Sequence, residues 1–286
     1  ESVEFFERGP PNSPLRPKAL LKLADALYNQ GNTQKAQEYY YKVVREYPNT
    51  EEARYATLSL IGMGGKEIGD ERMEKLLEDY LKRYPDSPQA LDLKYQLAQV
   101  YIRNGKEQRA KEILLDLINT PLQYRAILSL AQLEEDPTKR VVFLYKVYKE
   151  GDEEERKIAR DKLIEFYANI GDRRSLAELL AEGEDRDKVK AISVYLSMGD
   201  IPPAQSLANE LIKKGYRDRE FEEYLLELYK ATKSELYLDY LKSSKDEELK
   251  AQALYLSAQE KLNKGQKREA LEDLVSITLN AKNSSL

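Results

Sequence analysis

The side chains that could do chemistry are few in kind, because the 286-residue chain contains neither histidine nor cysteine. Serine–histidine–aspartate triads, thiol nucleophiles and the usual zinc sites are therefore excluded. Carboxylates, lysine, tyrosine, serine and threonine remain, and their spacing supports no particular reaction. We expect a protein that is not an enzyme and that uses no cofactor and no metal.

Three short segments come closest to a ligand site. Residues 62–67 (Gly-Met-Gly-Gly-Lys-Glu) resemble a phosphate-binding loop, but they lack the GxxxxGK[ST] spacing and the hydroxyl that would reach magnesium. We interpret them as a lengthened turn. The acidic runs 152–155 and 182–187 lack the alternate-residue spacing of a calcium loop. They favour helix starts, where carboxylates interact well with the positive end of the helix dipole.

The charge balance argues against nucleic acid as a partner. Lysine and arginine number 46 against 51 aspartates and glutamates, which gives a net charge of −5, whereas nucleic-acid binding depends on basic tracts. The locally basic segment 261–268 is interpreted as a solvated turn between two helices. No apolar run approaches the roughly 20 residues needed to span a bilayer, so we expect no membrane insertion by this chain.

The elements that must position these side chains are helices arranged as a repeat. The tripeptide Pro-[Asn/Asp]-[Ser/Thr] occurs three times with a spacing of 37 residues and ends at Ser13, Thr50 and Ser87. Proline cannot continue a helix, and the hydroxyl can cap the next helix by accepting hydrogen bonds from its first free amides. The repeating unit is therefore a pair of helices, which must stack on its neighbours to bury its apolar face.

A second signal is a glycine followed five residues later by a small residue. Glycine accepts the left-handed backbone that ends a helix, and alanine lets the two helices of a pair approach closely. The alanine matches are Gly31 with Ala36, Gly105 with Ala110, Gly199 with Ala204 and Gly265 with Ala270, and Gly171 with Leu176 is a weaker copy. The predicted turns lie at Gly31, near Gly69, and at Gly105, Asp136, Gly171, Gly199, Thr232 and Gly265. Their mean spacing of about 33 residues predicts an all-α superhelical solenoid of about eight helical pairs.

Residues 17–50 carry the clearest copy of the unit. Apolar stripes, a turn and a closing proline follow in order at Leu20, Leu23, Ala24, Leu27, Gly31, Ala36, Tyr40, Val43 and Pro48. This pattern resembles the tetratricopeptide repeat (TPR), a helix–turn–helix unit of about 34 residues. The tryptophan of the family is missing, since the chain has no Trp. The resemblance implies an α-α solenoid of TPR-like hairpins.

We expect residues 1–286 to form a single such solenoid. Residues 1–13 are interpreted as the end of a preceding repeat, residues 17–50, 51–87 and 91–121 as the clearest repeats, and residues 122–286 as divergent repeats. The register stays open over residues 121–150 and 217–244. Because the array would begin inside a repeat and end without a polar capping helix, we expect the chain to be a segment of a longer protein.

The resemblance implies that partners bind the concave face made by the first helix of each pair. Counted from the matched repeats, this face comprises Leu21, Asp25, Tyr28, Tyr55, Ser59, Tyr95, Gln99, Ile102, Tyr255, Gln259 and Leu262. Tyrosine recurs at one corresponding place, at Tyr55, Tyr95 and Tyr255. Its large contact area and polar tip suit recognition, but the same rings could instead fill gaps between adjacent helices.

The joints between repeats also point to a compartment. Tyr-Pro-[Asn/Asp]-[Ser/Thr] at residues 47–50 and 84–87 is similar to joints in bacterial cell-envelope TPR proteins, such as the Tol-Pal accessory protein and the outer-membrane assembly lipoproteins. This resemblance implies a periplasmic or membrane-tethered protein, with a cytoplasmic location as the alternative. The lack of Cys and His beside abundant Lys, Glu and Arg is typical of thermophile proteins.

Three hypotheses for function follow. The first is a non-catalytic scaffold that binds a protein or peptide in its concave groove. Asp25 would repel a terminal carboxylate, so the carboxylate clamp of chaperone-tail receptors is disfavoured. The second is a spacer or self-assembly module with end-to-end contacts around Phe5 and Phe6 and around Leu274 and Ile277. The third is the non-catalytic arm of a larger enzyme.

Overall fold

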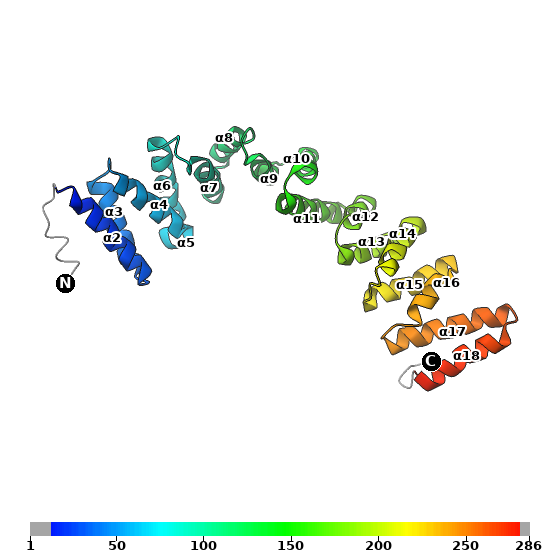
Figure 1. Ribbon diagram of the computed structural model, residues 1–286. Helices are drawn as coiled ribbons and strands as arrows, with labels where there is room; N and C mark the ends of the chain where they lie inside the picture. The colour runs from blue at the N-terminus through cyan, green and yellow to red at the C-terminus, as the bar shows by residue number, and fades with distance from the viewer. Residues whose placement is uncertain (1–12, 281–286) are drawn as a thin grey trace. The chain divides into compact units, whose positions relative to one another are not determined.

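Every regular element in the described part of the chain is an α-helix. The computed structural model describes residues 13–280 (Figure 1). In chain order the helices are α2 (Leu15–Asn29), α3 (Thr33–Glu46), α4 (Glu51–Met63), α5 (Gly65–Ile68), α6 (Asp70–Arg83), α7 (Ala90–Arg103), α8 (Glu107–Leu117), α9 (Gln123–Leu133), α10 (Pro137–Glu150), α11 (Glu153–Ile170), α12 (Arg173–Ala181), α13 (Asp185–Ser197), α14 (Ile201–Lys213), α15 (Arg219–Thr232), α16 (Glu235–Leu241), α17 (Glu247–Asn263) and α18 (Lys267–Asn280). The predicted all-α class is confirmed.

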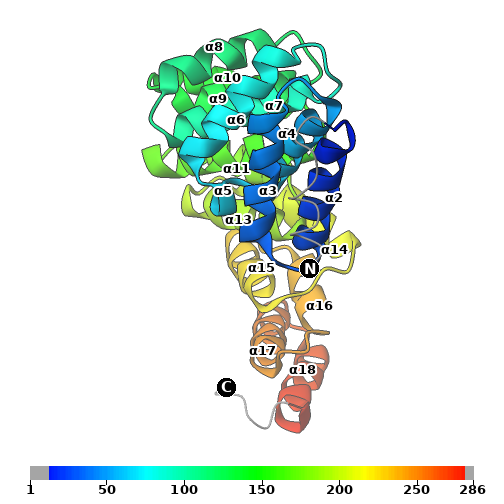
Figure 2. The same ribbon diagram turned by 90° about the vertical axis from the view of Figure 1, so that its left-hand side faces the viewer.

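Consecutive helices form hairpins at the turns that the sequence predicted. The helices on either side of these turns are α2 and α3, α4 and α6, α7 and α8, α9 and α10, α11 and α12, α13 and α14, α15 and α16, and α17 and α18. The short helix α5 lies inside the turn between α4 and α6, which makes this turn longer than the others. The last hairpin is seen clearly in two views, where α17 and α18 lie side by side (Figures 1 and 2).

The predicted turn glycines do adopt left-handed backbone. Gly31, Gly105, Gly171, Gly199 and Gly265 have φ angles between 71° and 84°, which a residue with a Cβ adopts only at a cost. In the divergent hairpin α15–α16, which has no such glycine, Lys233 takes the same role with φ 59°. The register that the sequence left open over residues 217–244 is therefore set by a left-handed lysine.

The joints between hairpins behave as predicted at Thr50 but not at Ser87. The Thr50 hydroxyl accepts a hydrogen bond from the Ala53 amide at 3.1 Å and caps α4. At the second joint, α7 begins only at Ala90 and the buried Ser87 Oγ has no hydrogen-bond partner. The Ser87 carbonyl, rather than its hydroxyl, accepts a hydrogen bond from the Ala90 amide at 3.0 Å.

In three hairpins, both helices carry a buried alanine, and the two alanines are 12 residues apart. The pairs Ala24 with Ala36, Ala98 with Ala110, and Ala258 with Ala270 are almost completely buried. The alanine side chain adds only a methyl group between the helices, so their backbones can approach closely. The predicted role of the alanine in the glycine–alanine signal agrees with this burial.

Both acidic runs lie at the starts of helices, α11 and α13. Asp152 and Glu155 form a reciprocal capping box at the start of α11, with amide-to-carboxylate distances of 2.9 and 2.8 Å. In the second run, Asp187 forms an ion pair with Arg160, and Asp185 forms one with Lys214. Two carboxylates of each run therefore have structural partners.

The chain divides into two compact units, Glu1–Arg156 and Lys157–Leu286. The core of the first unit runs from Leu20 on α2 to Leu133 on α9, and that of the second from Ala177 on α12 to Ala253 on α17. A single solenoid over residues 1–286 stays a prediction. The predicted end of a preceding repeat, including Phe5 and Phe6, lies outside the described residues except for Ser13.

A buried ion pair joins two turns of the second unit. The Arg217 Nη1 atom lies 2.9 Å from the carboxylate of the buried Glu222, whose other oxygen accepts a hydrogen bond from Ser244 Oγ at 2.6 Å. Arg217 also donates to the Tyr240 carbonyl at 2.9 Å, and its guanidinium lies 3.9 Å from the centroid of that ring. Both charges are thus compensated.

We expect Arg217→Met to lower the free energy of unfolding by about 3–5 kcal/mol, because it leaves the Glu222 carboxylate buried without its cation. The double variant Arg217→Met/Glu222→Leu should recover most of that loss, since no charge is then buried. Urea denaturation followed by circular dichroism measures both values. If the double variant is as unstable as the single one, packing rather than the unpaired charge is responsible.

We expect Lys233→Gly to raise the free energy of unfolding by about 1 kcal/mol, because glycine tolerates the left-handed backbone that lysine adopts at a cost. Lys230 is an exposed residue in α15, the helix that ends just before Lys233. Lys230→Gly should lower the free energy of unfolding by about 1 kcal/mol. Thermal denaturation of the two variants beside the parent provides the comparison. A loss of stability in both variants would contradict the strain at Lys233.

Candidate partner-binding face

The predicted face residues all lie on first helices of hairpins. Leu21, Asp25 and Tyr28 are on α2, Tyr55 and Ser59 on α4, Tyr95, Gln99 and Ile102 on α7, and Tyr255, Gln259 and Leu262 on α17. The first three helices belong to the first unit and α17 to the second. The structure therefore provides two separate parts of the predicted face, one on each unit.

In the first unit, side chains from several helices lie close to Asp25. The hydroxyl of Tyr40, a buried ring on α3, donates a short hydrogen bond to the Asp25 carboxylate. Tyr28 and Ser59 lie close enough to this hydroxyl to influence its pKa. Burial, and then Asp25, raise the pKa of Tyr40 above its ordinary value, so the phenol stays protonated and keeps donating. Side chains from three helices, α2, α3 and α4, thus meet at one place.

The tyrosines differ in exposure. Tyr28 is 43% exposed and Tyr55 55% exposed, whereas Tyr95 is half-buried and packs against the core of the first unit. Tyr95 stands three residues before the buried Ala98, but Tyr55 stands only two residues before the buried Thr57. The tyrosine of α4 is therefore one position out of register with that of α7, which corrects the predicted correspondence.

Gln99 and Ile102 have packing roles on α7. Gln99 Nε2 donates to Ser129 Oγ on α9 at 2.8 Å and links the first helices of two successive hairpins. Ile102 and Leu21 are half-buried and pack against the core. The exposed polar and aromatic area of the first unit's face is thus concentrated on α2 and α4.

The second part of the face lies on α17. Tyr255 is 42% exposed, Leu262 is 48% exposed, and Gln259 is also exposed. These positions are four and three residues apart, so they lie along one side of the helix. Tyr255 stands three residues before the buried Ala258, which is the same register as Tyr95 on α7.

A tyrosine–carboxylate pair that the sequence did not reveal lies beside the face. The Tyr101 hydroxyl on α7 donates to Glu78 Oε1 on α6 at 2.6 Å. Burial, and then the hydrogen bond to Glu78, raise the pKa of Tyr101 to about 12. The pair joins residues 23 positions apart on two hairpins, and periodicity within one helix carries no signal for such a contact.

The side chains of the face provide contact area and hydrogen-bonding groups. Tyrosine rings offer contact area, while Asp25, Ser59 and Gln259 offer hydrogen-bonding groups. Within residues 13–280, no group of three or more acidic side chains is placed to hold a metal ion. None of the helices in the same range has the length and apolarity required to cross a membrane.

Comparison with known families identifies repeats of one class in the chain. Residues 18–50 and residues 91–120 match models of the tetratricopeptide repeat. The matched segments make up less than half of the chain, and they coincide with hairpins α2–α3 and α7–α8, which carry Asp25, Tyr28, Tyr95 and Gln99. The chain thus contains tetratricopeptide repeats at these two places.

Solved structures of similar proteins are distant in sequence. A tetratricopeptide repeat protein of Parabacteroides merdae is 11% identical, with 89% of this chain and 98% of that chain covered and a TM-score of 0.46. PilF of Pseudomonas aeruginosa is 13% identical, with 74% and 97% covered and a TM-score of 0.42. Among curated proteins, none matches the chain.

We expect the free energy of unfolding to fall between pH 10 and pH 12 by up to about 1.4 kcal/mol per pH unit through Tyr101 alone. In this window the unfolded tyrosine has lost its proton and the folded one, with a pKa of about 12, has kept it. The stabilisation is therefore complete below pH 10 and is lost as the pH rises. Urea denaturation at pH 9, 10 and 11 should show a smaller pH dependence for Tyr101→Phe than for the parent. An identical dependence would rule out this titration.

Proposed function

We propose that the protein is a non-catalytic scaffold that binds a protein or peptide partner on the first helices of its hairpins. Tetratricopeptide repeats generally mediate protein–protein interaction, and the two matched repeats contribute most of the first unit's face. The observation that carries the proposal is the exposure of Tyr28 and Tyr55 beside the Asp25–Tyr40 pair. A rigid polar centre flanked by exposed rings is the composition of a recognition hot spot.

The charges on this face favour an internal or basic segment of the partner over a terminal carboxylate. Asp25 lies at the centre, Glu52 lies one turn before Tyr55, and Asp92 lies one turn before Tyr95. Within the described residues, none of these three carboxylates forms an ion pair. They would repel an anionic group and attract a lysine or arginine.

The cell envelope is our proposed location. Its support is the similarity of the joints at residues 47–50 and 84–87 to those of envelope TPR proteins. The first joint forms the cap that this motif implies, with Thr50 bonded to both the Ala53 amide and the Tyr47 carbonyl. A cytoplasmic location is the alternative.

Self-association is a second candidate function, favoured by α18. Leu271, Val275 and Leu279 recur every fourth residue on this helix and are 60%, 51% and 68% exposed. Such a stripe is a surface on which another helix could stack. The neighbouring Leu274 and Ile277, by contrast, pack inward against α17.

We expect Tyr28→Ala/Tyr55→Ala to weaken partner binding at least tenfold, because exposed tyrosines at a recognition centre each contribute on the order of 1–2 kcal/mol. The partner would first be captured by the parent chain from envelope and soluble fractions, identified, purified and then titrated by calorimetry. Tyr95 is left unchanged because its ring packs against the core.

The matched control is Leu115→Ala/Val142→Ala, which removes two exposed side chains from the second helices α8 and α10 of the same unit. It should bind like the parent, and circular dichroism should show that both variants keep their helices. Equal affinities for the parent and the tyrosine variant would reject the face, and a partner lost only when α18 is changed would favour association through that helix.

A further inference from the structure

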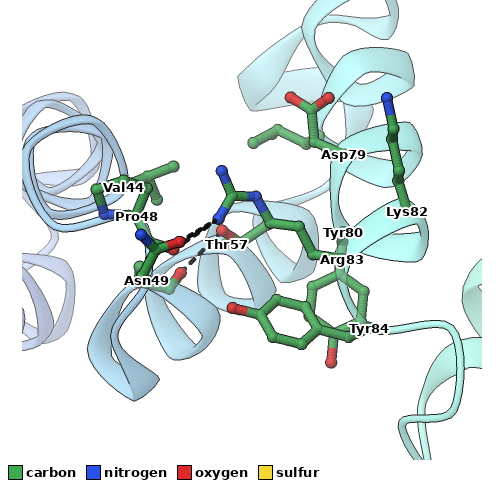
Figure 3. A pocket seen from close by; sticks show the side chains of 11 residues that line it. Val44, Pro48, Asn49, Thr57, Asp79, Tyr80, Lys82, Arg83 and Tyr84 are labelled. Atoms are coloured by element: carbon green, nitrogen blue, oxygen red, sulfur yellow. Dashed lines mark hydrogen bonds between the residues drawn. The ribbon is translucent and has the colours of Figure 1, made fainter.

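A cavity of about 620 Å³ lies among α3, α4 and α6 in the first unit. Figure 3 shows the side chains that line it. They are Val44, Pro48, Asn49, Ala53, Thr57, Leu76, Asp79, Tyr80, Lys82, Arg83 and Tyr84. Its volume is within the range of small-ligand sites, about 300–1,000 Å³.

This cavity is distinct from the partner-binding face. Ala53 and Thr57 line the cavity, and each is two residues from Tyr55 in the sequence. Two residues in an α-helix are about 200° apart around the axis. The cavity and Tyr55 therefore lie on nearly opposite sides of α4, and a ligand in one does not compete for the other.

The floor of the cavity presents apolar surface. Thr57 Oγ donates to the Ala53 carbonyl at 2.8 Å, so its hydroxyl is occupied by its own helix. The Tyr80 hydroxyl is occupied in turn, since it accepts a hydrogen bond from Arg54 Nε at 3.2 Å. The Tyr80 ring is only 1% exposed, whereas Val44 and the Tyr84 ring are half-buried. Val44, Leu76 and Tyr84 therefore remain as the contact surface, which suits an aromatic or branched apolar group.

The one cation directed across the cavity is the guanidinium of Arg83. Its Nη1 atom donates to the Pro48 carbonyl at 2.9 Å and to Asn49 Oδ1 at 3.2 Å. Both acceptors are neutral, and within residues 13–280 no ion pair involves Arg83. The side chains of Asp79 and Lys82 point away from this guanidinium in Figure 3. The charge is thus held in place by hydrogen bonds but is not neutralised.

We propose that this cavity binds a peptide segment in which an apolar side chain is followed by a carboxylate side chain. The apolar group lies against Val44, Leu76 and Tyr84. The carboxylate pairs with the free edge of the Arg83 guanidinium, where charge-assisted hydrogen bonds are available. Because Arg83 is already fixed by Pro48 and Asn49, little side-chain entropy is lost on binding.

The test compares two peptides that differ only in charge, N-acetyl-Phe-Glu-amide and N-acetyl-Phe-Gln-amide, by methyl NMR of the full chain. We expect the Val44 and Leu76 methyl signals to shift, and the glutamate peptide to bind about tenfold tighter than the glutamine peptide. The methyl signals of Leu115 and Val142, outside the cavity, should stay in place. Equal affinity of the two peptides, or shifts spread equally to Leu115 and Val142, would overturn the proposal.

Variants locate the effect. Arg83→Gln should remove the preference for glutamate and keep the weaker binding, whereas Lys82→Gln should leave the preference intact. Thr57→Leu should fill the floor and abolish binding of both peptides. Val44→Phe should also fill the cavity, from α3. It replaces Thr57→Leu in the test if that variant does not fold. Retained binding in a filled, folded variant contradicts the site. Since Tyr28→Ala/Tyr55→Ala leaves this cavity unchanged, the outcome is independent of the proposed partner-binding face.

Discussion

The structure depends on the close approach of the two helices in each hairpin. Three hairpins carry a pair of buried alanines, 12 residues apart across the turn. A larger side chain at either place would separate the helices and displace the next hairpin, because tightly packed cores do not absorb extra volume without strain. The left-handed turn residue between each pair fixes the direction in which the second helix returns. These two local requirements make the hairpin, and stacking then buries its apolar faces.

Stacking divides the surface of a first helix into core, exposed and cavity-lining positions, as α4 shows. Ala56 and Leu60 are buried in the core, Tyr55 is exposed, and Ala53 and Thr57 form the floor of the cavity. Ala53 and Thr57 have small side chains, which fill little of the space beside α4. A recognition surface and a cavity can therefore arise on one helix without any special loop.

The sequence predicted best the features that are local. A left-handed turn usually requires glycine, so the sequence predicted the turns at Gly31 and Gly105. The turn at Lys233 has no glycine, and the sequence therefore left its register open. The cap predicted at Ser87 is absent, since α7 begins only at Ala90. Contacts between helices were beyond prediction: the Asp25–Tyr40 pair, the burial of Tyr95 and the cavity beside Arg83 each require knowing which helices meet.

Tyrosine has two distinguishable roles in this chain, which contains no tryptophan. Tyr40, Tyr101 and Tyr216 bury much of their rings and donate their hydroxyls to Asp25, Glu78 and Asp218. Phenylalanine in their place would remove these hydrogen bonds. Tyr28, Tyr55 and Tyr255 are exposed, and within residues 13–280 their hydroxyls have no hydrogen-bond partner. A ring that is neither buried nor bonded internally adds little to the fold, so its contact area and its hydroxyl are both free for a partner. Burial and internal hydrogen bonding separate the two roles better than sequence position does. Tyr95 and Tyr255 occupy corresponding positions in their helices, but Tyr95 packs against the core and Tyr255 is exposed.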